Sequence, residues 1–147
     1  MDYPRICSLY HRSLFCDATG LSVVDSLLHF IVSKELEFDC IACRGVSGVI
    51  PAAVVAWKLN KRLLVVRKEE ERRDSHASSL LEGWLAPSYI IIDDFVSMGG
   101  TIRAITAAIE EAHRGYNLPS PDFRLILVYE RERNRLTNCS GIPIVVA

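Results

Sequence analysis

Apolar positions along the chain follow two different periods, which predict helices that alternate with strands. Between residues 22 and 35 they recur every three to four residues, and Ser22 with Asp25 resembles a capping box, so we predict an amphipathic helix there. Residues 49–59 are apolar nearly all round. This pattern predicts a buried helix, which tolerates Pro51 because the proline falls in its first turn.

A third helix is predicted from Gly100 to Arg114, with isoleucines on one face and Gly115 as its C-terminal stop. Short runs rich in valine, isoleucine and leucine separate the helices and are typical of buried strands. They are Cys40–Cys43, Leu63–Arg67, Tyr89–Asp93, Phe123–Tyr129 and Ile142–Val146. Residues 5–16 are ambiguous, and we interpret them as a candidate hairpin.

The alternation of strands and helices predicts an α/β fold: a mostly parallel, twisted sheet flanked by helices on both faces. The chain has 147 residues, of which 50% are hydrophobic and 24% charged, as expected for one soluble globular domain. Open sheets of this kind bind ligands beyond the carboxyl ends of their strands. We therefore look for function in the loops that follow the strands.

Net charge and hydropathy narrow the classes of function. The formal charge of −1 gives no overall attraction to nucleic acid or anionic membranes, so any anion site must be local. The longest apolar run, Val49–Trp57, is shorter than the roughly 18 residues of a membrane span, and the N-terminus lacks the apolar core of a signal peptide. The five cysteines have no disulfide-framework spacing. A cytoplasmic location is expected.

Cys40 and Cys43 form an isolated C-x-x-C pair within a predicted strand. Side chains three apart on a strand point to opposite faces, so the two thiols cannot chelate one ion. No second cysteine pair supports a zinc or redox site. We predict that both side chains pack in the core.

Two strands end in glycine-containing loops that open helices, Arg44–Gly48 and Ser97–Thr101. Glycine lets backbone N–H groups approach a ligand closely, and the dipole of the following helix favours negative charge. Each loop is therefore a candidate anion site. Taken alone, each also has a purely structural explanation, because glycine is common where a strand turns into a helix.

Asp93 and Asp94, between these loops in the sequence, favour the functional interpretation. Carboxylates accept hydrogen bonds from hydroxyls, and neighbouring side chains at a strand end can splay to reach two adjacent hydroxyls. The expected ligand carries a phosphate at one end, a diol in the middle and a second anionic group that reaches Arg44. Phosphoribosyl pyrophosphate is the common metabolite with this shape.

The stretch IIIDDFVSMGGT, residues 90–101, resembles the signature of the type I phosphoribosyltransferases: apolar residues, two acids and a loop that ends Thr-Gly-Gly-Thr. It departs from the signature at Met98, where the family usually has threonine; this removes one hydroxyl from the 5′-phosphate site but leaves the backbone donors. Upstream, CRGVSG resembles the pyrophosphate loop of the family, and VVRKEEERRDSHASSLLEG resembles a strand end followed by the mobile catalytic loop. The similarity covers about residues 39–114.

The resemblance implies an enzyme in which a nucleobase displaces pyrophosphate from phosphoribosyl pyrophosphate with the help of Mg²⁺. Asp93 and Asp94 would hold the ribose hydroxyls and, directly or through water, the metal ion. The candidate catalytic residues are Asp94, Lys68 and His76. The candidate substrate-binding residues are Arg44, Gly45, Ser47, Arg67, Lys68, Asp93, Asp94, Ser97, Met98, Gly99, Gly100, Thr101 and Tyr129.

Residues 68–81 have two interpretations. Their charges are those of an ordinary solvated helix with ion pairs between successive turns. The family places its mobile loop at this position, so the resemblance implies a lid that closes over the reaction and excludes water, with Lys68 or His76 contacting pyrophosphate. We favour the lid.

The base site is the least determined part. Family members hold the base with a small hood outside the sheet, for which this chain offers only residues 1–20 and 130–147 as hood or edge elements. Tyr129 could stack on a base and Arg131 could approach it. The chain is short and lacks the long N-terminal region typical of orotate enzymes, which favours a purine. Orotate or another pyrimidine stays open.

Two further readings, and the assembly, also stay open. The chain could be a non-catalytic regulator that binds phosphoribosyl pyrophosphate, with the cluster Arg131, Arg133 and Arg135 touching nucleic acid, although the intervening glutamates disfavour nucleic acid as a partner. A phosphatase of the haloacid dehalogenase type is disfavoured, because the acidic pair is not followed by the D-x-D-x-T pattern. The resemblance also implies a homodimer.

Overall fold

The computed structural model describes Leu14, residues 17–69 and residues 79–147. In this part of the chain the elements run in the order α1 (Asp17–Ser33), β1 (Cys40–Cys43), α2 (Gly45–Lys58), β2 (Arg62–Val66), β3 (Leu81–Gly83), β4 (Ser88–Asp93), α4 (Gly100–Gly115), β5 (Asp122–Val128), β6 (Asn138–Cys139) and β7 (Ile142–Val146). The candidate hairpin at residues 5–16, His76, most of the candidate lid and much of the N-terminal hood segment lie outside the described residues.

The described strands form one sheet in the order β3-β2-β1-β4-β5-β7-β6. The five inner strands, β2 to β7 in that order, are parallel, and β3 and β6 pair antiparallel at the two edges. β4 lies in the middle with every residue buried. A central parallel strand needs apolar side chains on both faces, which explains the unbroken run of isoleucines from Ile90 to Ile92.

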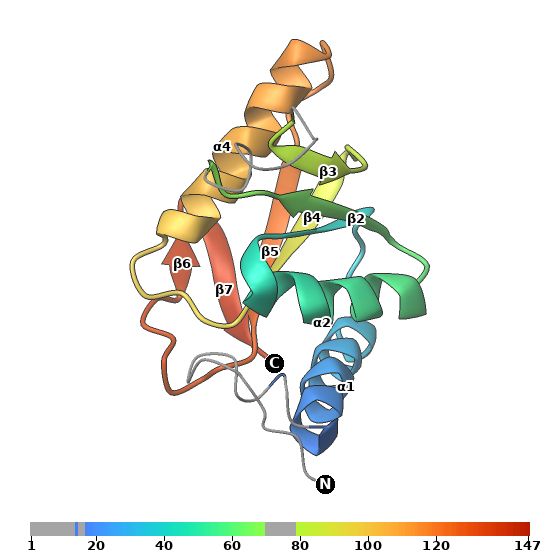
Figure 1. Cartoon of the computed structure of the whole chain (residues 1–147), viewed down its shortest axis with the longest axis vertical. Helices are drawn as coiled ribbons and strands as arrows, with labels where there is room; N and C mark the ends of the chain where they lie inside the picture. The colour runs from blue at the N-terminus through green and yellow to red at the C-terminus, as the bar shows by residue number, and fades with distance from the viewer. Residues whose placement is uncertain (1–13, 15–16, 70–78) are drawn as a thin grey trace, which may run out of the picture.

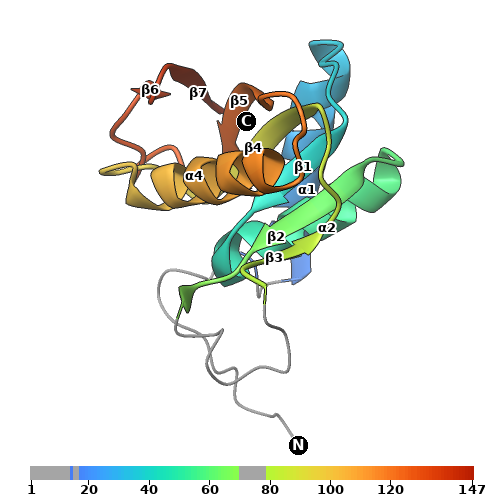
Figure 2. The ribbon, with the colours of Figure 1, turned by 90° about the horizontal axis from the view of Figure 1, so that it is seen from above.

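Helices cover both faces of the sheet, as predicted (Figures 1 and 2). Leu27 of α1 and Val55 of α2 pack on one face in one apolar cluster. Ile102, Ile105 and Ile109 of α4 pack on the other face in a second cluster. The predicted α/β class with a mostly parallel sheet is therefore confirmed.

The two N-terminal helix boundaries differ from the prediction. α1 begins at Asp17, so Ser22 and Asp25 lie inside the helix and form no capping box. α2 begins at Gly45, four residues earlier than predicted, and Pro51 lies in its interior. The residues read as a glycine loop thus form the first turn of α2.

Some side chains also lie elsewhere than predicted. Trp57 is 74% exposed, so the helix predicted to be buried has an exposed apolar side chain near its C-terminal end. His113 of α4 is buried, and its Nδ1 donates a hydrogen bond to the carbonyl oxygen of Pro119 at 2.7 Å. Nε2 of the same ring accepts a hydrogen bond from the Tyr89 hydroxyl at 3.2 Å. This pairing satisfies two polar groups inside the core.

Cys40 and Cys43 lie in different apolar clusters, one on each face of the sheet. The prediction that their side chains point in opposite directions is confirmed. Burial raises the pKa of each thiol to about 12, so both stay protonated at neutral pH. Among the described residues, no helix combines the length and hydropathy that crossing a bilayer requires.

Candidate functional site

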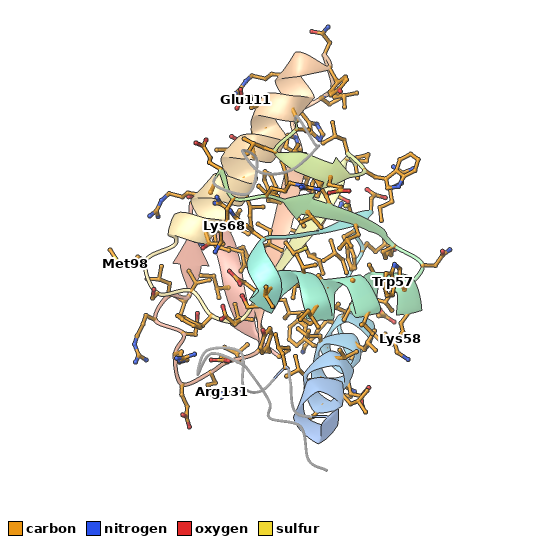
Figure 3. All side chains as sticks on the ribbon, in the orientation of Figure 1. Trp57, Lys58, Lys68, Met98, Glu111 and Arg131 are labelled. Carbon is orange, nitrogen blue, oxygen red and sulfur yellow. The ribbon has the colours of Figure 1, made fainter. Side chains whose placement is uncertain are left out.

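The site lies where the chain leaves β1 and β4, two neighbouring parallel strands. β1 leads into α2 on one face of the sheet, and β4 leads into α4 on the other. Their carboxyl ends therefore border a crevice at which the connections diverge, the usual ligand position in open parallel sheets. Figure 3 shows Lys68 and Met98 on the side of the molecule where α2 and α4 begin.

The crevice contains a cavity of about 400 Å³. Of the predicted binding residues, those that line it are Arg44, Gly45, Ser47, Lys68, Asp93, Asp94, Ser97, Met98, Gly99, Gly100 and Thr101. The sequence analysis did not single out four further lining residues, Val46, Phe95, Val96 and Ile102. The structure thus brings together two loops that lie about fifty positions apart in the sequence.

The acidic pair lines the cavity. Asp93 is 5% exposed and Asp94 is 9% exposed. Asp93 Oδ1 accepts hydrogen bonds from the backbone N–H of Asp94 at 3.0 Å and from the Ser47 hydroxyl at 3.3 Å. Burial and the neighbouring Asp94 carboxylate raise the pKa of Asp93 to about 7. Two adjacent carboxylates that are both shielded from water favour a ligand that donates hydrogen bonds or carries positive charge.

The turn after the acidic pair is held by the segment that follows β5. The carbonyl oxygen of Asp94 accepts the backbone N–H groups of Tyr129, at 3.1 Å, and Glu130, at 2.8 Å. Two residues on, the N–H of Val96 donates to Asn134 Oδ1 at 3.0 Å. The sequence analysis missed Asn134, since it lies 38 residues from its partner and no local pattern indicates it.

The loop before α4 depends on Gly99, which caps the helix at φ 77°, a left-handed conformation that favours glycine. A Cβ at this position would lie 2.6 Å from Cys139 Sγ and 2.9 Å from Arg103 Nη1. Arg103 Nη2 donates to the carbonyl oxygen of Met98 at 2.9 Å. Cys139 and Arg103 therefore support this loop, and no local pattern in the sequence indicates the role of Cys139.

Met98, the departure from the family signature, points away from the packed structure with 81% of its surface exposed. The described residues provide no side-chain cap for α4, and its first turn has no acidic residue. The backbone N–H groups at the start of α4 are therefore available to an anion.

The loop before α2 supplies a cation. Arg44 precedes the helix in an extended conformation, and among the described residues its Nε atom is buried without a hydrogen-bond partner. Lys68 reaches over the same turn, with Cε 3.8 Å from where a Cβ on Gly45 would lie. A buried guanidinium N–H without an acceptor is costly, so an anion here would satisfy it.

Close packing holds the first turn of α2 against the site. A Cβ on Gly48 would lie 3.0 Å from the carbonyl oxygen of Ile92 and 3.3 Å from Cys43 Cβ. Glycine at this position lets the helix approach the ends of β1 and β4.

Two predicted binding residues lie outside the cavity lining. Arg67 forms an ion pair with Glu82 of β3. The Tyr129 hydroxyl donates a hydrogen bond to the carbonyl oxygen of Ser47 at 2.8 Å. Burial raises the pKa of this phenol above its ordinary value. Arg131, considered for the base site, is exposed.

The described residues bring no three His, Cys, Asp or Glu side chains together as a metal site. Asp93 and Asp94 supply carboxylate oxygens at the cavity, and Mg²⁺ commonly binds one or two carboxylates while substrate phosphates and water complete its coordination. The residues present therefore fit a magnesium ion that arrives with a phosphorylated ligand.

The sequence matches no protein-family model. It is 31% identical to an adenine phosphoribosyltransferase of Pseudomonas fluorescens, in an alignment that covers 81% of this chain and 78% of that protein. The chain belongs to the type I phosphoribosyltransferase family. It is also 33% identical to a xanthine-guanine phosphoribosyltransferase of Chromohalobacter salexigens, over 61% of this chain.

A third similar protein is named as a regulator and not as an enzyme. It is the transcriptional regulator GfcR of Methanocaldococcus jannaschii, at 25% identity over 91% of this chain. The chain spans 57% of the length of the xanthine-guanine phosphoribosyltransferase and 63% of the regulator. The proteins to which this chain is similar therefore include several named as enzymes and one named as a regulator.

Solved phosphoribosyltransferase structures share the fold. An orotate phosphoribosyltransferase from Aeropyrum pernix superposes with a TM-score of 0.65 at 20% identity, covering 96% of this chain and 76% of that one. An adenine phosphoribosyltransferase from Thermoanaerobacter pseudethanolicus gives a TM-score of 0.60 at 20% identity, covering 92% and 82%. Both kinds of phosphoribosyltransferase therefore share the sheet and helix layers seen here.

Proposed function

We propose that the chain is a magnesium-dependent phosphoribosyltransferase that moves the phosphoribosyl group of phosphoribosyl pyrophosphate to a nucleobase and releases pyrophosphate, a reaction of nucleotide salvage. The observation that carries the proposal is the position of the buried pair Asp93 and Asp94 between the N-terminal ends of α2 and α4. This arrangement suits a molecule with a diol at its centre and an anionic group at each end.

The acidic pair would act on the sugar. Asp93 and Asp94 accept hydrogen bonds from the two ribose hydroxyls, and their charge favours the oxocarbenium-like state in which the anomeric carbon becomes positive. Because Ser47 and the backbone already hold Asp93 Oδ1, little reorganisation is needed when the sugar binds. Asp94 is also the proposed proton acceptor from the base.

The two helix starts would hold the charged ends. The N–H groups of the loop Ser97–Thr101 bind the 5′-phosphate, and Met98 contributes its backbone there and no hydroxyl. Arg44 and Lys68 neutralise the leaving pyrophosphate, with Nε of Arg44 finding its missing acceptor. Arg67 and His76 stay predictions: Arg67 is paired with Glu82, and His76 lies outside the described residues.

Asp93 and Asp94 would hold Mg²⁺ directly or through water, and the ion would supply positive charge to the phosphorylated substrate. The lid at residues 68–81 would exclude water during transfer. The base would lie near Phe95 and Val96, which line the cavity beside the sugar position. We favour a purine, in keeping with the similarity to proteins named adenine and xanthine-guanine phosphoribosyltransferases.

The test is pyrophosphate release from phosphoribosyl pyrophosphate and Mg²⁺ with adenine, guanine, hypoxanthine, xanthine, orotate or uracil. We expect turnover with one or more purines, and none in the double variant Asp93→Asn, Asp94→Asn at retained fold. Turnover with orotate or uracil alone would replace the purine proposal by the pyrimidine alternative. No turnover with any base, in protein that binds phosphoribosyl pyrophosphate by calorimetry, would contradict a catalytic role.

A regulator that binds phosphoribosyl pyrophosphate without catalysis is the second candidate. The similarity to the GfcR transcriptional regulator over 91% of the chain favours it. Arg131, Arg133 and Arg135 would then face nucleic acid, although Arg133 pairs with Glu130, which dilutes the positive charge. Retention of DNA or RNA at low salt that changes when phosphoribosyl pyrophosphate is added would support this function, and absence of retention would remove it. A homodimer in the cytoplasm is proposed under either function.

A further inference from the structure

One part of the cavity wall is tied to a distant segment of the chain. Residues 94–96 form the turn directly after β4, and residues 129–135 follow β5. The carbonyl oxygen of Val96 accepts the N–H of Arg135 at 2.9 Å, and the N–H of Val96 donates to Asn134 Oδ1 at 3.0 Å. In Figure 1 the segment between β5 and β6 runs beside the loop that leads from β4 to α4. The segment after β5 therefore determines where Val96 lies in the cavity wall.

The Asn134 side chain uses both ends of its amide. While Oδ1 accepts the N–H of Val96, Nδ2 donates to the carbonyl oxygen of Leu136 at 2.8 Å. An aspartate could accept from Val96 but could not donate to Leu136, and an apolar side chain could do neither. Val96 is 3% exposed, so its N–H has little access to water if the Asn134 acceptor is lost. A buried N–H without an acceptor is costly, so this amide fixes the Val96 backbone.

Other parts of the site have supports of their own. The carboxylate of Asp93 accepts the hydroxyl of Ser47 in α2. The loop before α4 is held by Arg103, whose Nη2 donates to the carbonyl oxygen of Met98. Within the described part of the chain, no hydrogen bond joins Asn134 to Asp93 or to that loop. Loss of the Asn134 amide should therefore displace one wall of the cavity and leave the sugar and phosphate ends in place.

We propose that Asn134 is a positioning residue for the nucleobase, because it fixes the wall of Phe95 and Val96 against which the base lies. The inference rests on the proposed function, which places the base beside these two residues. Asn134 is not among the residues that line the cavity, and it acts through the backbone of Val96. A gap of about 0.5–1 Å between two atoms forfeits a quarter to a half of their dispersion attraction. A displaced wall therefore weakens binding of the base and not of the sugar phosphate.

Ligands with and without a base separate this role from a general loss of structure. Ribose 5-phosphate carries the sugar and the phosphate, and adenosine, guanosine and uridine 5′-monophosphates add a base. Calorimetry with Mg²⁺ gives the dissociation constant of ribose 5-phosphate divided by that of the tightest nucleotide, and this base ratio measures what the base contributes to binding. In Asn134→Ala we expect the nucleotide to bind about tenfold more weakly, and ribose 5-phosphate to bind within about twofold of the unmodified chain.

Three further variants complete the test. Asn134→Gln keeps both polar atoms but moves them by one methylene, so this milder change should lower the base ratio in the same direction. Asn134→Asp keeps the oxygen that accepts from Val96 and should restore most of the ratio, because its added charge acts on the phosphate of every ligand alike. Arg103→Gln is the matched control: it removes the support of the Met98 carbonyl and should weaken all ligands by the same factor. Far-UV circular dichroism verifies the fold of each variant.

The outcomes distinguish this inference from the proposed function. An unchanged base ratio in Asn134→Ala and Asn134→Gln would overturn the positioning role, and so would an equal loss of affinity for ribose 5-phosphate and the nucleotides. If the unmodified chain binds ribose 5-phosphate as tightly as every nucleotide, no base lies at this wall, and the inference fails while the sugar-phosphate site stands. If the unmodified chain binds none of these ligands, the proposed function itself is contradicted, and the inference fails with it.

Discussion

The phenolic hydroxyl of Tyr129 donates a hydrogen bond to the backbone carbonyl oxygen of Ser47, at 2.8 Å. In an α-helix this carbonyl would accept the N–H of the residue four positions later, but that residue is Pro51, which has no N–H. The residue that follows β5 therefore supplies the donor that α2 lacks. The same contact fixes the turn whose Ser47 hydroxyl donates to Asp93.

Removal of this hydroxyl should destabilise the fold. In Tyr129→Phe the Ser47 carbonyl loses its side-chain donor, and we expect the free energy of unfolding to fall by about 1–2 kcal/mol. Urea unfolding followed by circular dichroism measures the change.

A double-mutant cycle tests the stated cause. In a Pro51→Ala background the new N–H of residue 51 can donate to Ser47, so loss of the Tyr129 hydroxyl should cost much less. Equal costs in the two backgrounds would mean that the hydroxyl stabilises the protein in some other way.

Asp93 should make the fold less stable as pH rises. Its pKa is about 7 in the folded protein and 3.8 in the unfolded reference, so between these values the folded state binds more protons than the unfolded state. Stability is therefore lost as pH rises from about 4 to about 7, and the loss is complete above that range. Asp93→Asn should remove this loss and raise the free energy of unfolding by roughly 1–3 kcal/mol near pH 8, with little effect near pH 4.

Unfolding in urea across this pH range, without Mg²⁺ or phosphate, measures the effect. Glu111→Gln, an exposed position on α4, serves as the control and should change stability equally little at every pH (Figure 3). An Asp93→Asn curve parallel to that of the unmodified chain would show that burial of this carboxylate costs no stability.

The two glycines before α4 should respond differently to alanine. At Gly99 the added methyl meets Cys139 Sγ at 2.6 Å and the backbone is left-handed, so Gly99→Ala should cost about 2 kcal/mol or more. At Gly100 an added Cβ would meet none of the described residues within 4 Å beyond its chain neighbours and its own helix backbone, and the residue begins a helix. Gly100→Ala should therefore leave stability unchanged or raise it by up to about 1 kcal/mol. Thermal unfolding of the two variants compares them directly. Equal losses would mean that the contact with Cys139 is not the cause.

Arg44 should account for stabilisation by pyrophosphate. Its buried Nε atom finds an acceptor when an anion binds, so saturating pyrophosphate with Mg²⁺ should raise the melting temperature of the unmodified chain. We expect Arg44→Gln to lose most of this rise, since its binding should weaken at least tenfold. Lys58→Gln, at the far end of α2, should keep it. A full rise in Arg44→Gln would exclude this arginine from the anion site.

Local patterns predicted most of the sheet and the acidic pair because each of these features is formed by consecutive residues. The isoleucine run of β4 and the two aspartates that follow it can be read without knowledge of any partner. β3 and β6 were missed because they have three and two residues, too few to establish a period. The start of α2 was misplaced because glycine and proline normally mark helix ends, and tertiary contacts outweigh that preference here.

The supports of the site were not predictable for a different reason. Cys139 contacts Gly99 from 40 residues away, and Tyr129 reaches Ser47 from 82 residues away. Such contacts depend on which strands become neighbours in the sheet, and no short stretch of sequence specifies that. The exposure of Trp57 was not predicted for a related reason, since an apolar stretch does not by itself show which of its side chains face the core.

α2 and α4 belong to opposite layers of the molecule, and their apolar clusters are separated by the sheet. Their first turns nevertheless border a single cavity. A molecule anchored at both turns would connect the two layers at a point where the polypeptide itself does not. Amide hydrogens in both helices should then exchange with solvent more slowly when it is bound, as the layers come to open as one cooperative unit and no longer independently.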